Sequence, residues 1–91
     1  MDILFDYLEK KYKILNLKFY KKDNELVIAN HYYYFKIKKI QEKYILSRFW
    51  KRFFFRFLFK KQLINMTNIY NNIYKFSKKN NLIIEELSIL S

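Results

Sequence analysis

The first thirteen residues alternate apolar and polar positions with the period of an α-helix. Apolar side chains recur at spacings of three and four residues, and charged side chains fill the other side. Asp2 precedes this pattern, and aspartate is a preferred residue at that place because its carboxylate accepts hydrogen bonds from the first backbone N–H groups. We therefore expect a short amphipathic helix with Leu4, Phe5, Leu8 and Tyr12 on its buried side.

From Leu15 the period of the pattern changes to two, which indicates β-strands. Three segments qualify, at residues 15–19, 26–29 and 33–37. The stretch KKDNE at 21–25 and the pair Asn30–His31 provide turns, because Asn and Asp tolerate the backbone angles of tight turns. We expect these segments to form an antiparallel meander, covered by the N-terminal helix through Leu4, Phe5 and Leu8.

The stretch FWKRFFFRFLFKK at 49–61 fits both a strand and a helix. As a helix, its consecutive phenylalanines would spread apolar surface around most of the cylinder. We favour a strand, because phenylalanine is enriched in strands and the alternation is regular over eight residues. The face of this strand that is turned toward the core would carry Phe53, Phe55, Phe57 and Phe59. Phe55 and Phe57 are accordingly expected in the core.

The remaining segments favour helices and one short element. Residues 39–47 could form one or two helical turns, and residues 62–77 keep helical spacing of apolar side chains. A last apolar element spans residues 82–90. The sequence thus predicts one α+β domain over residues 1–91, with a small antiparallel sheet of three or four strands, an N-terminal helix and one or two C-terminal helices.

The charge of the sequence indicates a class of binding partner. The formal net charge is +11, from 19 Lys and Arg against 8 Asp and Glu, and between Leu26 and Ile84 the only acid is Glu42. A basic block of one sign favours contact with a polyanion. The candidate nucleic-acid-binding residues are Lys36, Lys38, Lys39, Lys43, Arg48, Lys51, Arg52, Arg56, Lys60 and Lys61.

Four of these candidates are spaced by four residues: Arg48, Arg52, Arg56 and Lys60. A spacing of four is even, and it is also about one helical turn, so a strand and a helix would both place them on one side. We expect this row to contact phosphate.

Residues that carry enzymatic chemistry are scarce. The sequence has no Cys and no Gly, and it has a single histidine, His31, in a predicted turn. Thiol nucleophiles, thiolate metal sites and glycine-rich phosphate loops are therefore excluded. We expect no enzymatic activity, no catalytic residue, no metal or cofactor site and no small-molecule substrate.

The composition also points to a source. Residues encoded by GC-rich codons are absent or rare, whereas Lys, Ile, Asn, Phe and Tyr dominate, which indicates an AT-rich genome such as that of an organelle. The sequence contains no targeting segment and no stretch of about 20 apolar residues that could span a bilayer. We expect a protein made in its own organelle, with the mitochondrion as the first choice.

These observations favour a small RNA-binding structural component of a ribonucleoprotein, such as a mitochondrial ribosomal protein. Its expected partners are RNA, with rRNA the first choice, and neighbouring ribonucleoprotein subunits. One alternative is an accessory, membrane-associated subunit of an organellar membrane complex, which a helix over residues 41–64 would favour. Another is a DNA-binding or host-interaction protein of an AT-rich virus or plasmid.

Overall fold

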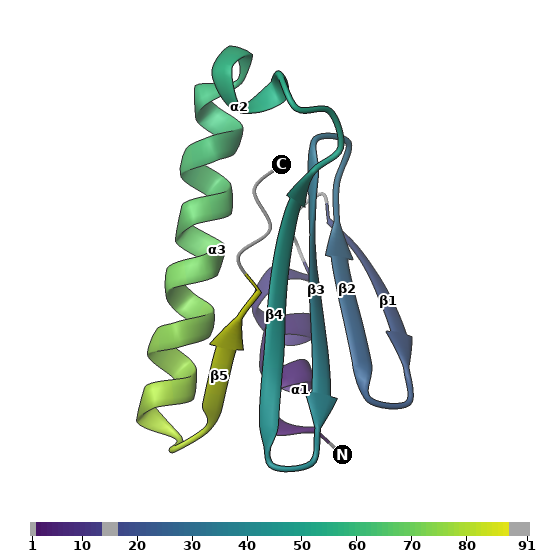
Figure 1. Ribbon diagram of the computed structural model, residues 1–91, viewed down its shortest axis with the longest axis vertical. Helices are drawn as coiled ribbons and strands as arrows, with labels where there is room; N and C mark the ends of the chain where they lie inside the picture. The colour runs from purple at the N-terminus through teal and green to yellow at the C-terminus, as the bar shows by residue number, and fades with distance from the viewer. Residues whose placement is uncertain (1, 14–16, 88–91) are drawn as a thin grey trace.

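The computed structural model describes residues 2–13 and 17–87 and contains helices and a five-stranded sheet (Figure 1). In chain order the elements are α1 (Ile3–Tyr12), β1 (Lys18–Lys22), β2 (Glu25–Ala29), β3 (Tyr33–Ile40), β4 (Lys43–Trp50), α2 (Phe55–Leu58), α3 (Lys60–Lys79) and β5 (Ile83–Glu86). The α+β class, the N-terminal helix and the helical region toward the C-terminus are confirmed. The sheet has one more strand than the three or four that the sequence predicts.

The sheet follows the order of the chain, from β1 to β5. The first three strands form the predicted antiparallel meander and β4 extends it by one antiparallel strand, whereas β5 lies parallel to β4 at the edge; neither β4 nor this parallel pairing was predicted from the sequence. The meander contains the predicted strands at 26–29 and 33–37. Residues 15 and 16 of the first predicted strand lie outside the described residues, and the observed strand runs on to Lys22.

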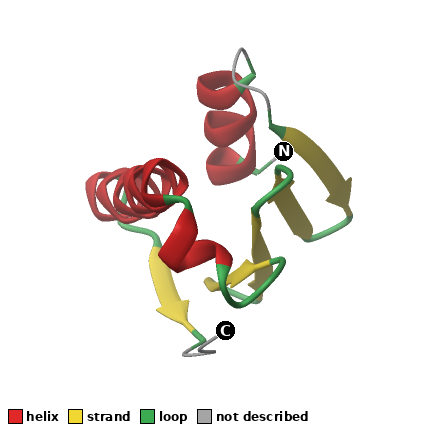
Figure 2. Ribbon diagram, turned by 90° about the horizontal axis from the view of Figure 1, so that it is seen from above, coloured by secondary structure: helices red, strands yellow, loops and turns green. Residues whose placement is uncertain are grey.

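Both long helices pack on the same face of the sheet, which curves around them (Figure 2). The core between the layers contains Leu4 and Leu8 from α1, Ile73 from α3, and an inward row from the strands that includes Phe35 and Leu46. All five of these side chains are fully buried. The other face of the sheet has no helix over it among the described residues.

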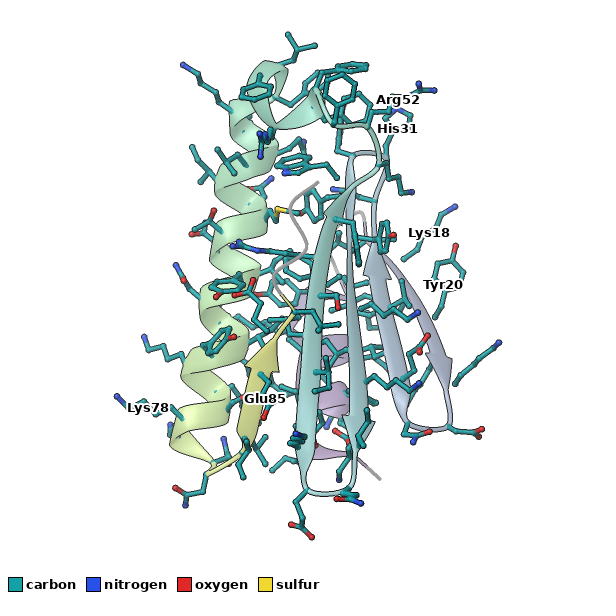
Figure 3. The ribbon with its side chains drawn as sticks, in the orientation of Figure 1. Lys18, Tyr20, His31, Arg52, Lys78 and Glu85 are labelled. Atoms are coloured by element: carbon teal, nitrogen blue, oxygen red, sulfur yellow. The ribbon has the colours of Figure 1, made fainter. Side chains whose placement is uncertain are left out.

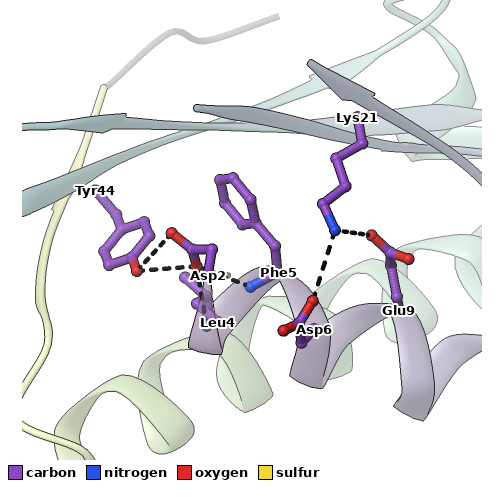
Figure 4. A network of polar contacts seen from close by, with 7 residues as sticks. All are labelled: Asp2, Leu4, Phe5, Asp6, Glu9, Lys21 and Tyr44. Carbon is purple, nitrogen blue, oxygen red and sulfur yellow. Dashed lines mark hydrogen bonds and ion pairs between the residues drawn. The ribbon is translucent and has the colours of Figure 1, made fainter. Parts of the chain in front are cut away.

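Helix α1 is fixed at its start by Asp2 (Figure 4). Its Oδ1 accepts hydrogen bonds from the backbone N–H groups of Leu4 at 3.0 Å and Phe5 at 3.1 Å, as the sequence predicts. The same carboxylate accepts the hydroxyl of Tyr44 on β4 at 3.0 Å. One side chain therefore begins the helix and joins it to the sheet.

The predicted helical turns at 39–47 are wrong, because these residues form the end of β3 and most of β4. Ile40 pairs with Lys43, which leaves a two-residue loop in which Gln41 has a positive φ of 57°. Such loops usually carry glycine or asparagine, and this chain has no glycine. The turn therefore had no recognisable signature in the sequence.

The predicted strand at 49–60 is also wrong. Strand β4 ends at Trp50, a turn follows, and α2 and α3 begin at Phe55 and Lys60. Side chains two apart on a helix point about 200° apart, so the expected row of phenylalanines does not form. Phe55 is buried at 9% exposure, as predicted, whereas Phe57 is 65% exposed and lies outside the core.

The predicted helix at 62–77 is confirmed within α3. It ends in a hydrogen-bond pattern typical of helix ends: Leu82 N–H donates to the Ser77 carbonyl at 2.8 Å, and Asn81 has a positive φ of 57°. Asparagine here replaces the usual glycine. The chain then enters β5, the described part of the predicted element at 82–90, whose residues 88–90 lie outside the described residues.

Candidate nucleic-acid interface

The candidate interface begins with the uncovered face of the sheet, called here the open face. Strand register places on it side chains from all five strands. The members that carry charge or a ring are Lys18, Tyr20, Lys22, Glu25, Tyr34, Lys36, Lys38, Lys43, Phe49 and Glu85. Figure 3 shows Lys18 and Tyr20 projecting outward from the edge strand β1.

The ten residues predicted from the sequence fall into three places. The open face receives Lys36, Lys38 and Lys43. The opposite, helix-covered face receives Lys39 and Arg48. The connection from β4 through α2 into the start of α3 carries Lys51, Arg52, Arg56, Lys60 and Lys61. The structure therefore does not bring the ten together into one site.

The two cations on the covered face hold the fold together. The Lys39 ammonium lies 3.6 Å from the Asp2 carboxylate. The Arg48 guanidinium lies 3.1 Å from Glu86 of β5 and 4.1 Å from the centre of the Tyr70 ring of α3. The contact with Asp2 joins β3 to the start of α1, and the contacts of Arg48 join β4 to β5 and to α3, which gives both cations a structural role.

The predicted row of cations, spaced by four, does not form. Arg48 contacts Tyr70, ten residues along α3 from Lys60, and ten residues of helix span about 15 Å. Arg52 lies in the turn before α2, at the same end of the molecule as His31 (Figure 3). The row required one regular element over 48–60, and the chain has three elements and a turn there.

On the open face, positive charge exceeds negative charge. Two lysines have acidic neighbours: Lys36 lies 3.9 Å from Glu25, and Lys43 lies 3.2 Å from Glu85. In the described part of the chain, the other three lysines of this face, Lys18, Lys22 and Lys38, take part in no ion pair. The face thus keeps a net positive charge across its width.

Flat rings lie among these lysines. Tyr34 of β3 and Phe49 of β4 are direct partners in the strand register, with ring centres 4.7 Å apart and planes 20° apart. Tyr20 on β1 is exposed. Sequence reasoning did not select these rings, or Lys18 and Lys22, as site residues. The alternation of Tyr34, Lys36 and Lys38 along one strand already indicated a shared face.

The second surface is the segment 51–64, called here the tip, at the upper end of the molecule in Figure 1. Its backbone turns through hydrogen bonds from Phe55 N–H to Arg52 O at 3.0 Å and from Phe59 N–H to Phe55 O at 2.9 Å. Phe55 and Phe59, 5.2 Å apart, pack on Tyr32 from the β2–β3 connection. These rings anchor the tip to the sheet.

Four tyrosines, Tyr12, Tyr33, Tyr44 and Tyr70, have pKa values above the ordinary value of about 10, and burial is the largest cause in each. Burial raises the pKa of Tyr33 to about 12. Burial, and then a hydrogen bond to Asp2 or to Glu86, raises the pKa of Tyr44 and of Tyr70. The hydroxyls of Tyr44 and Tyr70 therefore stay protonated near neutral pH and donate hydrogen bonds to Asp2 at 3.0 Å and to Glu86 at 2.7 Å.

A cleft of about 420 Å³ lies between the β2–β3 connection and α3. Its lining is uncharged and rich in amides, including Asn30, Gln62 and Asn72, with His31 at its edge. Within residues 2–13 and 17–87, no group of three or more His, Asp or Glu residues could hold a metal ion. No helix in the same residues is long and apolar enough to cross a membrane.

No family model, curated protein or solved structure matches this chain. The geometry of the open face and of the tip is therefore the basis for the proposals below.

Proposed function

We propose that the protein is a small RNA-binding structural component of a ribonucleoprotein and that it binds single-stranded RNA on the open face. The observation that carries the proposal is the open face itself, on which lysines and flat rings alternate with no helix over them. The AT-biased composition supports an organelle, with the mitochondrial ribosome as the expected assembly and rRNA as the expected ligand.

The chemistry of the open face suits unpaired nucleotides. Lysine ammonium groups replace the counterions of phosphates, and aromatic rings stack on bases that are free of a duplex. Lys36 and Lys38 alternate with Tyr34 on β3, and β1 and β4 likewise bring both lysine and an aromatic ring to the same surface. The tip cations add to the positive field that attracts the polyanion.

The experiment measures RNA affinity against salt for the variant Lys18→Ala/Lys38→Ala, whose lysines form no ion pair in the described chain. Each lost phosphate contact on a single strand lowers the slope of log affinity against log salt by about 0.7, so we expect a decrease of about 1.4. The matched control is Lys10→Ala/Lys13→Ala, which removes two exposed lysines of the α1 region. An unchanged slope in the open-face variant would contradict the proposal.

The rings are tested by Phe49→Leu, which keeps an apolar side chain but removes the stacking surface. Base stacking contributes about 1–3 kcal/mol per base, so affinity should fall at every salt concentration while the slope stays constant. A thermal unfolding midpoint near that of the parent protein serves as the control for folding. Tighter binding to duplex DNA than to single-stranded RNA would favour the DNA-binding alternative.

A further inference from the structure

The tip exposes large apolar side chains that the proposed RNA-binding face does not use. Phe53 is 73% exposed, Phe57 65% and Leu58 66%, and Ile64 near the start of α3 is also exposed. Four large exposed apolar side chains within twelve residues of chain are typical of a binding surface. The patch therefore needs a partner.

The exposure of these side chains is built into the fold. Phe55 and Phe59 point inward onto Tyr32, and the short helix between them turns Phe57 and Leu58 the other way. His31 packs against the same cluster, 5.1 Å from the Tyr32 ring and 6.3 Å from the Phe55 ring. The inward rings, Phe55 and Phe59, fix the tip on the sheet. Phe57 and Leu58 on the other side are left exposed.

The charge around the patch has one sign. The tip contains five cations, Lys51, Arg52, Arg56, Lys60 and Lys61, and no acid occurs anywhere from residue 43 to residue 84. In the described residues, Lys51, Arg52, Lys60 and Lys61 form no ion pair. The Arg56 guanidinium lies 4.7 Å over the Phe57 ring, which places a cation directly at the apolar surface.

We propose that the tip docks on an anionic lipid bilayer. Cations at the headgroups, with phenylalanine and leucine below them, form the usual composition of a segment that lies in a membrane interface. RNA phosphates would pair with the cations, and RNA bases could stack on the phenylalanine rings. Leu58 and Ile64, however, have no flat ring for stacking and would stay in contact with water. The hydrocarbon of a bilayer removes both the rings and the aliphatic side chains from water.

The test is co-sedimentation of the whole chain with vesicles of phosphatidylcholine alone and of phosphatidylcholine containing about one third phosphatidylserine. We expect binding to the anionic vesicles only. The variant Phe57→Ser/Leu58→Ser should lower that binding at least about tenfold, because both apolar side chains are removed from the interface. Both residues are exposed, so the variant should keep its fold.

The matched control is Tyr20→Ser/Ile83→Ser, which removes two apolar side chains, each 56% exposed, from the open face. This control should bind the anionic vesicles as the parent protein does. Equal loss of vesicle binding in both variants would overturn the proposal, and so would equal binding of the parent protein to neutral and anionic vesicles.

The charge component is tested by Arg52→Ala/Arg56→Ala against Lys75→Ala/Lys78→Ala in α3. Each cation near an anionic surface contributes about fivefold in affinity, so the tip variant should bind about 25-fold more weakly than the parent, and the α3 variant should change much less. If Phe57→Ser/Leu58→Ser instead loses RNA binding and keeps vesicle binding, the tip belongs to the RNA interface and membrane docking is overturned.

Discussion

Phe55 and Phe57 lie two residues apart in the same short helix and have opposite surroundings. Phe55 packs between Tyr32 and Phe59, whereas Phe57 meets solvent and the Arg56 guanidinium. The burial of a side chain, more than its type, sets what its removal costs. Two identical substitutions in this helix should therefore differ widely in their effect on stability.

Phe55→Ala should lower the free energy of unfolding by about 3 kcal/mol, because it leaves a cavity in a cluster of rings. Phe57→Ala should change it by no more than about 0.5 kcal/mol, the usual range for an exposed position. Urea unfolding followed by circular dichroism measures both. A large loss in the Phe57 variant would mean that its ring packs on the protein in solution.

The buried tyrosines give stability a dependence on alkaline pH. A pKa that is higher in the folded chain than in the unfolded chain stabilises the fold below the unfolded value and loses that contribution as the pH rises through the folded value. Burial raises the pKa of Tyr33 to about 12, and the pKa values of Tyr44 and Tyr70 are also raised by burial and by their carboxylate partners.

We therefore expect the thermal midpoint to stay level between neutral pH and about pH 9 and to fall above about pH 10, where unfolded tyrosine ionises. Tyr44→Phe should make this fall shallower, because it removes one of the four tyrosines whose pKa is raised. Tyrosinate absorbance during the titration tests the cause. Full ionisation of the tyrosines near pH 10 without loss of structure would contradict it.

Among the elements, α1 depends most on one residue. Asp2 begins the helix through two backbone N–H groups, and it also contacts the Tyr44 hydroxyl and the Lys39 ammonium. Asp2→Ala should cost about 1–2 kcal/mol for the cap and about 1–3 kcal/mol for the buried hydroxyl left without its partner. Urea unfolding measures the sum.

Asp2→Asn is the matched control, because an asparagine side chain still accepts from the backbone N–H groups at a helix start. It should retain most of the stability and lose only the part due to charge. A double-mutant cycle with Tyr44→Phe isolates the contact between α1 and β4. Equal losses for Asp2→Ala and Asp2→Asn would show that charge, and not capping, fixes the helix.

Elements with a strong period were predictable from the sequence. Helix α1, strands β2 and β3 and most of α3 carry both the expected spacing and the expected partners. Strand β4 was missed because its turn at Gln41 has no glycine, and the tip was missed because consecutive phenylalanines fit two periods at once. The local pattern alone does not decide the structure of such segments. At the tip, the contacts of Phe55 and Phe59 with Tyr32 do.

The sequence predicted the positive charge of the candidate site, but it did not predict the surface on which that charge lies. The basic block in the sequence is real, but the fold distributes it over two faces and a tip. Strand pairing brings Arg48 to Glu86, a residue 38 positions away, and sequence reasoning had no means to see that partner. The pairing of β1 with β2 places Lys18 opposite Ala29, which pairs in turn with Tyr34, and this register makes Lys18 part of the open face.

At the scale of the whole molecule, the acids of the described residues belong to elements other than the tip. Among the described residues, Asp2, Asp6, Glu9, Glu25, Glu85 and Glu86 each form an ion pair. The other two acids, Asp23 and Glu42, lie in the hairpin turns, at the opposite end from the tip in Figure 1. The resulting field orients the tip toward a negative surface. The strands run along the long axis, so the open face would stay accessible beside such a surface.

The parallel pairing of β5 with β4 has a consequence for the order of events during synthesis. A parallel neighbour requires a long crossover, and here α3 provides it, so β5 emerges from the ribosome well after β4. Until then the outer edge of β4 has no partner strand, and Arg48 has no Glu86. The four-stranded meander can pair as it is made, because its contacts are local. The nascent chain therefore passes through a stage with an unpaired β4 edge, open to strand pairing with another chain, and β5 closes that edge late.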